Sequence, residues 1–199
     1  MSSFDVETRH GRAVVRMAAP EGARGLLVLG PGASGQTGSA DLALACSVAG
    51  SLGMAAAVVQ PPYAVAGRRV PPRGASTDEA FADVVAVLRE RFPDGPLVTG
   101  GRSFGGRVAC RTVEATGADA VLCLAFPLQP PGDRPSRQPE LTPVEVPCLI
   151  VQGRGDAFGV PIAPPNGELV LVDGDHSLKK DHAAIREALS RWLTERLAS

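Results

Sequence analysis

The stretch Gly101-Arg102-Ser103-Phe104-Gly105 decides how this chain is expected to fold. It lies between a short apolar stretch, residues 97–100, and a helix-compatible stretch, residues 107–113. A Gly-x-Ser-x-Gly between a strand and a helix predicts a nucleophile elbow, a tight turn that holds the serine in a strained backbone conformation. The small flanking residues let strand and helix cross closely, and the hydroxyl then lies at a helix N-terminus. Because glycine and serine are abundant here, the pattern alone is equally consistent with an ordinary glycine-rich turn.

Apolar, β-favouring runs alternate with helix-length segments, which is typical of a mostly parallel sheet covered by helices on both faces. The segments 61–76 and 126–144 are rich in proline and lack periodicity, so we expect connections without secondary structure there. No segment is long enough for a separate cap domain, and residues 1–199 are expected to form one domain. The expected strands are residues 3–8, 12–18, 25–29, 54–59, 97–99, 120–124, 148–151 and 168–172, and the expected helices cover residues 40–52, a segment beginning at residue 76, residues 107–113 and residues 181–197.

The composition is that of an ordinary globular chain, with 44% hydrophobic and 21% charged residues. The formal net charge of −1 gives no large basic field, so neither nucleic acid nor a membrane surface is expected as a partner. Residues 1–7 lack the pattern of a secretory signal, and no apolar run approaches the roughly 18 residues of a membrane helix. The four cysteines lack metal-ligand spacing, and we expect reduced, buried thiols in a cytoplasmic protein.

A serine hydroxyl needs a base that takes its proton and a third group that orients the base. His176 is the expected base and Asp156 the expected orienting carboxylate, because each follows an apolar strand and the order Ser, Asp, His suits this chemistry. Asp173 and Asp175 are alternatives for the carboxylate, but they lie so near His176 in sequence that they are expected to shape a turn. Ordinary loop residues remain the alternative for His176 and Asp156. Together these features predict an α/β-hydrolase fold.

Attack on a carbonyl also needs hydrogen-bond donors for the oxyanion that forms. The backbone N–H of Phe104, the residue after the serine, is expected to be one donor. The other is expected from the loop after strand 25–29, at Gly32, although this loop is also consistent with a simple Gly/Pro turn. This chemistry needs no metal and no other cofactor, and none is expected.

Several stretches carry a family resemblance: Pro62-Tyr63 with Ala66-Gly67-Arg68-Arg69, Gly100–Arg107, Phe126–Gly132, Gln152-Gly153 with Asp156-Ala157-Phe158-Gly159, and Asp175-His176. On these residues the chain resembles a family of small bacterial α/β-hydrolase-like proteins. That family is akin to a testis-expressed protein and to a subunit of the non-specific-lethal chromatin complex, and is related to the dienelactone hydrolases. The resemblance covers about residues 25–185. It implies the α/β-hydrolase fold with Ser103, Asp156 and His176 in the triad positions.

Two positions depart from that family's pattern. If the glycines align, Pro31 falls where an oxyanion donor is expected, and proline has no N–H. Either Gly32 or Ala33 then donates from a shifted loop, or the oxyanion hole lacks a donor, which costs on the order of 10²–10³ in rate. The second departure is Gln129, which stands where the family tends to have a histidine.

The residues together predict a serine hydrolase that cleaves a small carboxylic ester or thioester, with a small-molecule acyl compound as its partner. Without a cap domain, loops would wall the substrate pocket, and we expect Tyr63, Phe126, Gln129 and Phe158 to face it. The oligomeric state does not follow from the sequence.

Two other functions fit the same residues. A non-catalytic protein-interaction module on a hydrolase scaffold is favoured by Pro31 and by the relative in a chromatin complex. Acyl transfer to an acceptor other than water would use the same triad. Finally, Arg68, Arg69 and Arg102 either favour an anionic substrate or are simply solvated.

Overall fold

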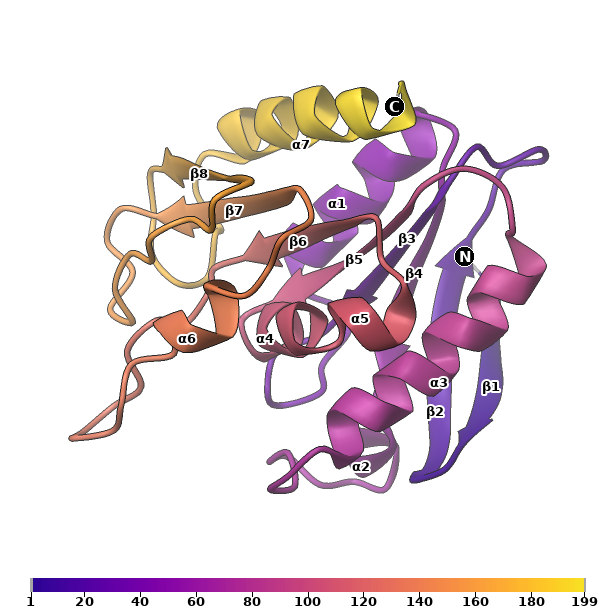
Figure 1. The fold of residues 1–199 in the computed structure, drawn as a ribbon, viewed down its shortest axis with the longest axis horizontal. Coiled ribbons are helices and arrows are strands. Elements are labelled where there is room, and N and C mark those ends of the chain that lie inside the picture. Colours follow the sequence, from indigo (N-terminus) through magenta and orange to yellow (C-terminus); the bar gives the residue numbers. More distant parts are fainter. Residues whose placement is uncertain (1, 199) are drawn as a thin grey trace.

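The computed structural model describes residues 2–198, which form an eight-stranded sheet flanked by helices (Figure 1). The strand order is β1-β2-β4-β3-β5-β6-β7-β8. β2 runs antiparallel to both of its neighbours, β1 and β4. The other strands of the sheet, in the order β4-β3-β5-β6-β7-β8, run parallel to one another. The strands are β1 (Ser2–Thr8), β2 (Gly11–Ala18), β3 (Leu26–Gly30), β4 (Ala55–Gln60), β5 (Leu97–Arg102), β6 (Ala120–Leu124), β7 (Cys148–Gly153) and β8 (Gly167–Val172).

Helices cover both faces of the sheet. In Figure 1, α1 (Ala40–Ser51) and α7 (His182–Leu197) lie together on one face, while α3 (Ser76–Arg91) and α4 (Phe104–Arg111) lie on the other. The short helices are α2 (Pro62–Val65), α5 (Val113–Thr116) and α6 (Gln138–Leu141). This is the α/β-hydrolase fold predicted from the sequence, and it carries no separate cap.

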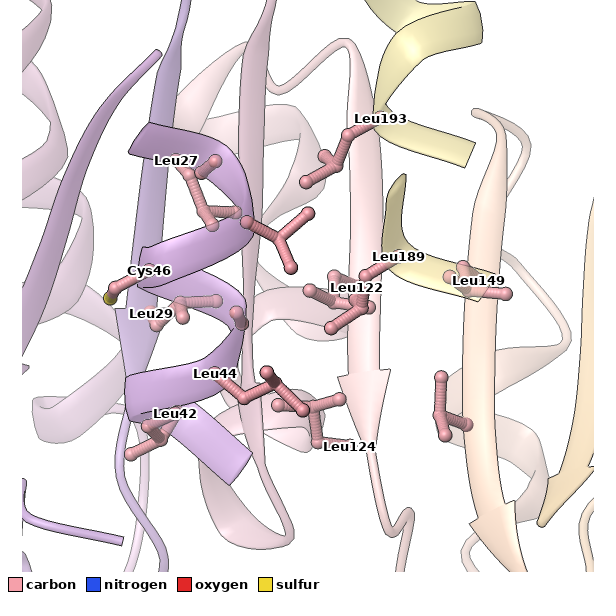
Figure 2. Packing of buried hydrophobic residues seen from close by; sticks show 14 of the residues in the cluster. Leu27, Leu29, Leu42, Leu44, Cys46, Leu122, Leu124, Leu149, Leu189 and Leu193 are labelled. Carbon is pink, nitrogen blue, oxygen red and sulfur yellow. The ribbon is translucent and has the colours of Figure 1, made fainter. Parts of the chain in front are cut away.

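The side chains of the buried strands point alternately to the two faces of the sheet, so the core has two layers. Because successive side chains of a strand point to opposite faces, Leu27 and Leu29 pack beneath α1, whereas Leu26 and Val28 pack on the α3 side. Figure 2 shows the first layer, in which Leu122 and Leu124 of β6 meet leucines of α1 and α7. Burial on both faces explains why the parallel strands read as continuous apolar runs.

Three glycines allow β5 and α4 to cross against β3. A Cβ at Gly105 would overlap the Gly30 carbonyl oxygen, and a Cβ at Gly101 would overlap the same atom. Between these glycines Ser103 adopts φ 51° and ψ −108°, a left-handed conformation that is strained for any residue with a side chain. The predicted elbow is therefore confirmed by its backbone geometry.

The predicted element order is confirmed, with local differences. The segments 61–76 and 126–144, expected to be without secondary structure, contain the four-residue helices α2 and α6. The helix expected over residues 107–113 begins earlier, at Phe104. The four cysteines are buried and free. Within residues 2–198, no helix has the length and hydrophobicity needed to cross a membrane.

We expect Gly105→Ala to lower the free energy of unfolding by at least about 2 kcal/mol, because the new methyl group cannot fit between α4 and β3. Gly50→Ala is the control: Gly50 is an exposed helical glycine with open space around its Cβ position. This change should raise stability by about 0.5–1 kcal/mol. Urea unfolding followed by circular dichroism measures both. Equal effects at the two positions would contradict a tight crossing at the elbow.

Candidate active site

Ser103 lies at the turn between the carboxyl end of β5 and the first residue of α4. Its backbone N–H donates to the Leu124 carbonyl oxygen at 2.8 Å, which ties the turn to the end of the neighbouring strand β6. The side chain thus stands half-buried at the sheet edge where the parallel strands end. Open parallel sheets build their ligand sites at this edge.

A continuous chain of hydrogen bonds joins Ser103, His176 and Asp156. The distance from His176 Nε2 to Ser103 Oγ is 2.9 Å, and the distance from His176 Nδ1 to Asp156 Oδ2 is 2.7 Å. Both are normal hydrogen-bond lengths. The structure therefore brings together the three residues that the sequence singled out, although they come from three separate loops. Asp173 and Asp175 are outside this chain; Asp175 instead accepts hydrogen bonds from Ser177, as expected of a turn former.

The Asp156 carboxylate is buried and satisfied by fixed donors. Its side chain has 0% exposure, its Oδ1 accepts the Phe158 backbone N–H at 2.8 Å, and its Oδ2 accepts from Gln152 Nε2 at 2.8 Å. Gln152 is itself fully buried and also donates to the carbonyl oxygens of Phe126 and Gly159. This glutamine was not predicted as a site residue, although Gln152-Gly153 was among the stretches that carried the family resemblance.

His176 is held from two further directions. The Phe158 ring packs against the imidazole, with ring centroids 4.4 Å apart and the planes tilted by 49°. Arg102 Nη2 donates to the His176 carbonyl oxygen at 3.0 Å. The imidazole is therefore fixed by its neighbours as well as by its two hydrogen bonds.

The predicted oxyanion donors are both free. Within residues 2–198, neither the N–H of Phe104 nor the N–H of Gly32 donates to a protein acceptor. For Phe104 this follows from its place at the start of a helix, where N–H groups lack intrahelical acceptors. Pro31 and Gly32 are both buried, and the Tyr63 hydroxyl donates to the Ala33 carbonyl oxygen at 2.8 Å, which braces this loop from behind.

The four residues expected to face substrate lie in different places. Phe158 contacts His176, as described above, and Gln129 is exposed on the loop after β6. Tyr63 is buried and lines an apolar cavity of about 20 Å³ together with Pro31 and Phe104. The expectation for Phe126 was wrong, because its side chain has no exposed surface and packs in the core with Leu141 and Ile150.

The comparisons with known proteins agree with this geometry. A family model described as an alpha/beta hydrolase domain matches residues 23–194. The chain belongs to this alpha/beta hydrolase family. A comparison with curated protein sequences gave no match. The narrower resemblance to the testis-expressed and chromatin-complex relatives stays a prediction.

Solved structures of other hydrolases share the fold at low identity. An alpha-beta serine hydrolase homologue from Coxiella burnetii has a TM-score of 0.77 at 19% identity, covering 96% of this chain and 97% of that one. A serine hydrolase without a lid from Xanthomonas campestris has a TM-score of 0.74 at 17% identity, covering 100% and 95%. A dienelactone hydrolase from Anabaena variabilis has a TM-score of 0.76 at 15% identity, covering 98% and 97%.

In this hydrolase fold, Arg102 links the elbow to a buried carboxylate. Its Nε lies 3.0 Å from Oδ2 of Asp41, whose side chain at the start of α1 has 0% exposure. The angle between the groups is poor, so they form a close ion pair rather than an aligned hydrogen bond. Since the same guanidinium holds the His176 carbonyl, Arg102 acts as a positioning residue. From the sequence we expected Arg102 either to favour an anionic substrate or to be simply solvated, and neither role describes these contacts.

We expect Arg102→Met to lower the free energy of unfolding by about 3 kcal/mol, because it leaves the Asp41 carboxylate buried without a counter-charge. The double variant Arg102→Met/Asp41→Leu removes both charges and should recover most of that loss. Chemical denaturation of the three proteins gives the coupling energy directly. If the second substitution adds to the destabilisation instead, the ion pair does not stabilise the buried carboxylate.

Proposed function

We propose that this protein is a serine hydrolase that cleaves a small carboxylic ester or thioester through Ser103, His176 and Asp156. The observation that carries the proposal is the unbroken series of hydrogen bonds from Ser103 Oγ through the imidazole to the buried Asp156 carboxylate. A serine in this arrangement has a base within reach and a carboxylate that fixes the tautomer of the base. Membership of the alpha/beta hydrolase family supports the same reaction class.

The reaction proceeds in two halves. In the first, Ser103 Oγ bonds to the carbonyl carbon while His176 Nε2 takes the hydroxyl proton. Collapse of the tetrahedral intermediate breaks the bond to the leaving oxygen or sulfur, which receives that proton from the imidazolium. In the second half, water adds to the acyl-serine and gives a proton to His176, which returns it to Ser103 as the carboxylic acid departs. Asp156 stays ionised and stabilises the imidazolium in both halves.

The oxyanion needs donors that are free before substrate arrives. The N–H groups of Phe104 and Gly32 satisfy that condition, as both lack a protein acceptor within the described residues. Pro31 removes a donor from the position before Gly32, but Gly32 itself is buried beside Arg102, with its virtual Cβ 3.3 Å from Arg102 Nη1. We therefore assign the second oxyanion donor to the N–H of Gly32, one residue after Pro31.

Two competing functions make different predictions. A non-catalytic interaction module does not need an activated serine, so a covalent serine probe separates it from the hydrolase. Acyl transfer to another acceptor shares the first half-reaction and differs in how fast water releases the acyl group.

We expect a fluorophosphonate probe to label Ser103 in the wild-type protein, as located by peptide mass mapping. Ser103→Ala should abolish labelling, and His176→Ala should slow it by more than about 10³-fold, since the hydroxyl loses its base. Ser51→Ala on α1 is the control and should label normally. An unlabelled wild-type protein with a native circular dichroism spectrum would favour the interaction module.

Asp156→Asn should lower kcat for a 4-nitrophenyl ester by about 10³–10⁴-fold, because the wrong tautomer of His176 then faces the serine. Asp173→Asn is the matched control on the same side of the site: Asp173 is exposed and outside the hydrogen-bonded chain, so its loss should have little effect. Steady-state kinetics at neutral pH compare the two. A larger loss for Asp173→Asn would reassign the carboxylate.

A further inference from the structure

A groove rich in arginine begins beside the proposed nucleophile. Phe104, the residue after Ser103, lines it together with Ala33 of the Pro31 loop. Its volume is about 560 Å³, which lies in the range of small-molecule sites. The charged lining residues are Arg73, Arg107, Arg111, Arg134, Arg137 and Glu140. Five arginines and one glutamate line the groove, so its lining carries an excess of positive charge although the whole chain has a net charge of only −1.

Two of these arginines are already neutralised. Arg107 Nη2 lies 2.6 Å from Glu140 Oε1, and Arg111 pairs with both Glu140 and Asp78 at 2.7 Å. Burial raises the pKa of Glu140, but the two neighbouring guanidinium groups outweigh it and hold the pKa below its ordinary value. These pairs fasten α4 to α6 and α3, so they serve the fold as well as the groove.

The other three arginines have no carboxylate partner. Within residues 2–198, Arg73, Arg134 and Arg137 form no ion pair. Arg137 donates to the Pro127 carbonyl oxygen at 3.1 Å. Burial, together with the positive charge of Arg107 and Arg134, lowers the pKa of Arg137. Among the described residues, the groove therefore contains three guanidinium groups that are not engaged in an ion pair.

The wall that carries Arg134 and Arg137 is held in place. Gln129 Nε2 donates to the Arg134 carbonyl oxygen, and the Arg137 N–H donates to the Leu128 carbonyl oxygen, both at 2.8 Å. The Gln129 N–H donates to the Phe158 carbonyl oxygen at 2.7 Å, which attaches this wall to the loop of Asp156. Figure 1 shows the wall as the long connection between β6 and α6. These bonds fix the backbone that carries Arg134 and Arg137, and the bond to the Pro127 carbonyl oxygen also holds the Arg137 guanidinium.

The remaining surface of the groove suits the carbon chain of an ester. The Phe104 ring lies 5.6 Å from the guanidinium carbon of Arg107 and 5.8 Å from that of Arg111, within the range of a cation–π contact. Pro71 and Pro72 form part of the opposite wall, next to Arg73. An apolar segment that leaves Ser103 on the side of Phe104 would enter the groove that these arginines line.

We propose that this groove binds an oxyanion group, a carboxylate or a phosphate, at the far end of the substrate, so that the enzyme prefers anionic esters or thioesters to neutral ones. This proposal rests on the proposed function, since it assigns the substrate class of that same site. Guanidinium groups suit it because they present paired N–H donors to carboxylate and phosphate oxygens.

Two pairs of substrates test the proposal and separate the two sources of the anion. In the acyl pair, 4-nitrophenyl hydrogen glutarate is compared with 4-nitrophenyl valerate, which has the same chain length but ends in a methyl group. In the leaving-group pair, S-acetyl-4′-phosphopantetheine is compared with S-acetyl-pantetheine. In at least one pair, kcat/KM of the anionic member should exceed that of the neutral member about 10-fold or more. Salt at about 0.5 M should reduce this preference, because the groove is open to solvent.

The double variant Arg134→Gln/Arg137→Gln should lower the anionic-to-neutral ratio of kcat/KM at least about 10-fold, mainly through KM. Arg73→Gln tests the opposite wall independently and should lower the same ratio. Arg16→Gln, at an exposed position on β2, removes one positive charge as Arg73→Gln does; it is the matched control for that single variant and should leave the ratio as in the wild type. Arg107 and Arg111 are left intact because their ion pairs support the fold.

The outcomes distinguish the two proposals. If Ser103 is labelled by the fluorophosphonate but neither pair shows an anionic preference, the groove proposal is wrong and the hydrolase proposal stands. A preference that survives both groove variants overturns the assignment to these arginines. If the serine is not labelled at all, the hydrolase proposal fails first and the groove proposal, which depends on it, fails with it.

Discussion

The close crossing of β5 and α4 over β3 is the constraint on which the rest of the site depends. Gly30, Gly101 and Gly105 leave no room for a side chain between the three backbones, and this contact forces Ser103 into a left-handed conformation. Such strain costs on the order of 1–3 kcal/mol and persists only where the surroundings impose it. Here the buried strands beside the turn and the hydrogen bond to Leu124 impose it. The result is a serine that points out of the sheet edge while its neighbour Phe104 offers a free N–H.

The second feature of the site is a carboxylate that is buried away from water. Asp156 has its charge distributed over three donors: His176, Gln152 and the Phe158 N–H. Donors to the ionised form offset part of the cost of removing it from water. Phe158 contributes twice, because its N–H binds the carboxylate while its ring packs on the imidazole. The loop after β7 therefore fixes the orientation of His176 and holds the buried Asp156 carboxylate next to it.

The sequence predicted the parts of this site that depend on local patterns. The elbow, most strands and the three residues that meet at the sheet edge could be recognised, because each follows from a pattern in a few neighbouring residues. The role of Gln152 could not, since it depends on β7, Phe126 and the Gly159 turn meeting in space. Phe126 was misassigned for a similar reason: Ala125 has φ 53°, and this left-handed residue lets the chain turn so that the phenylalanine enters the core.

The arginine groove is a second feature that could not be predicted from the sequence, because its residues meet only in the folded chain. Sequence reasoning drew attention to Arg68, Arg69 and Arg102, whereas the groove combines residues from the loop before α3, from α4 and from the connection before α6.

Arg102 lies instead at the centre of a different network, within reach of Gly32, Asp41 and the His176 carbonyl. One guanidinium thus lies beside the loop of Gly32 and interacts with the first turn of α1 and with the loop of His176. Pro31 restricts the backbone φ angle of the residue just before Gly32. A side chain at position 32 would press on that guanidinium, and through it on His176. The loop of Gly32 and the loop of His176 therefore share Arg102 as a neighbour, so a substitution at position 32 is expected to affect both.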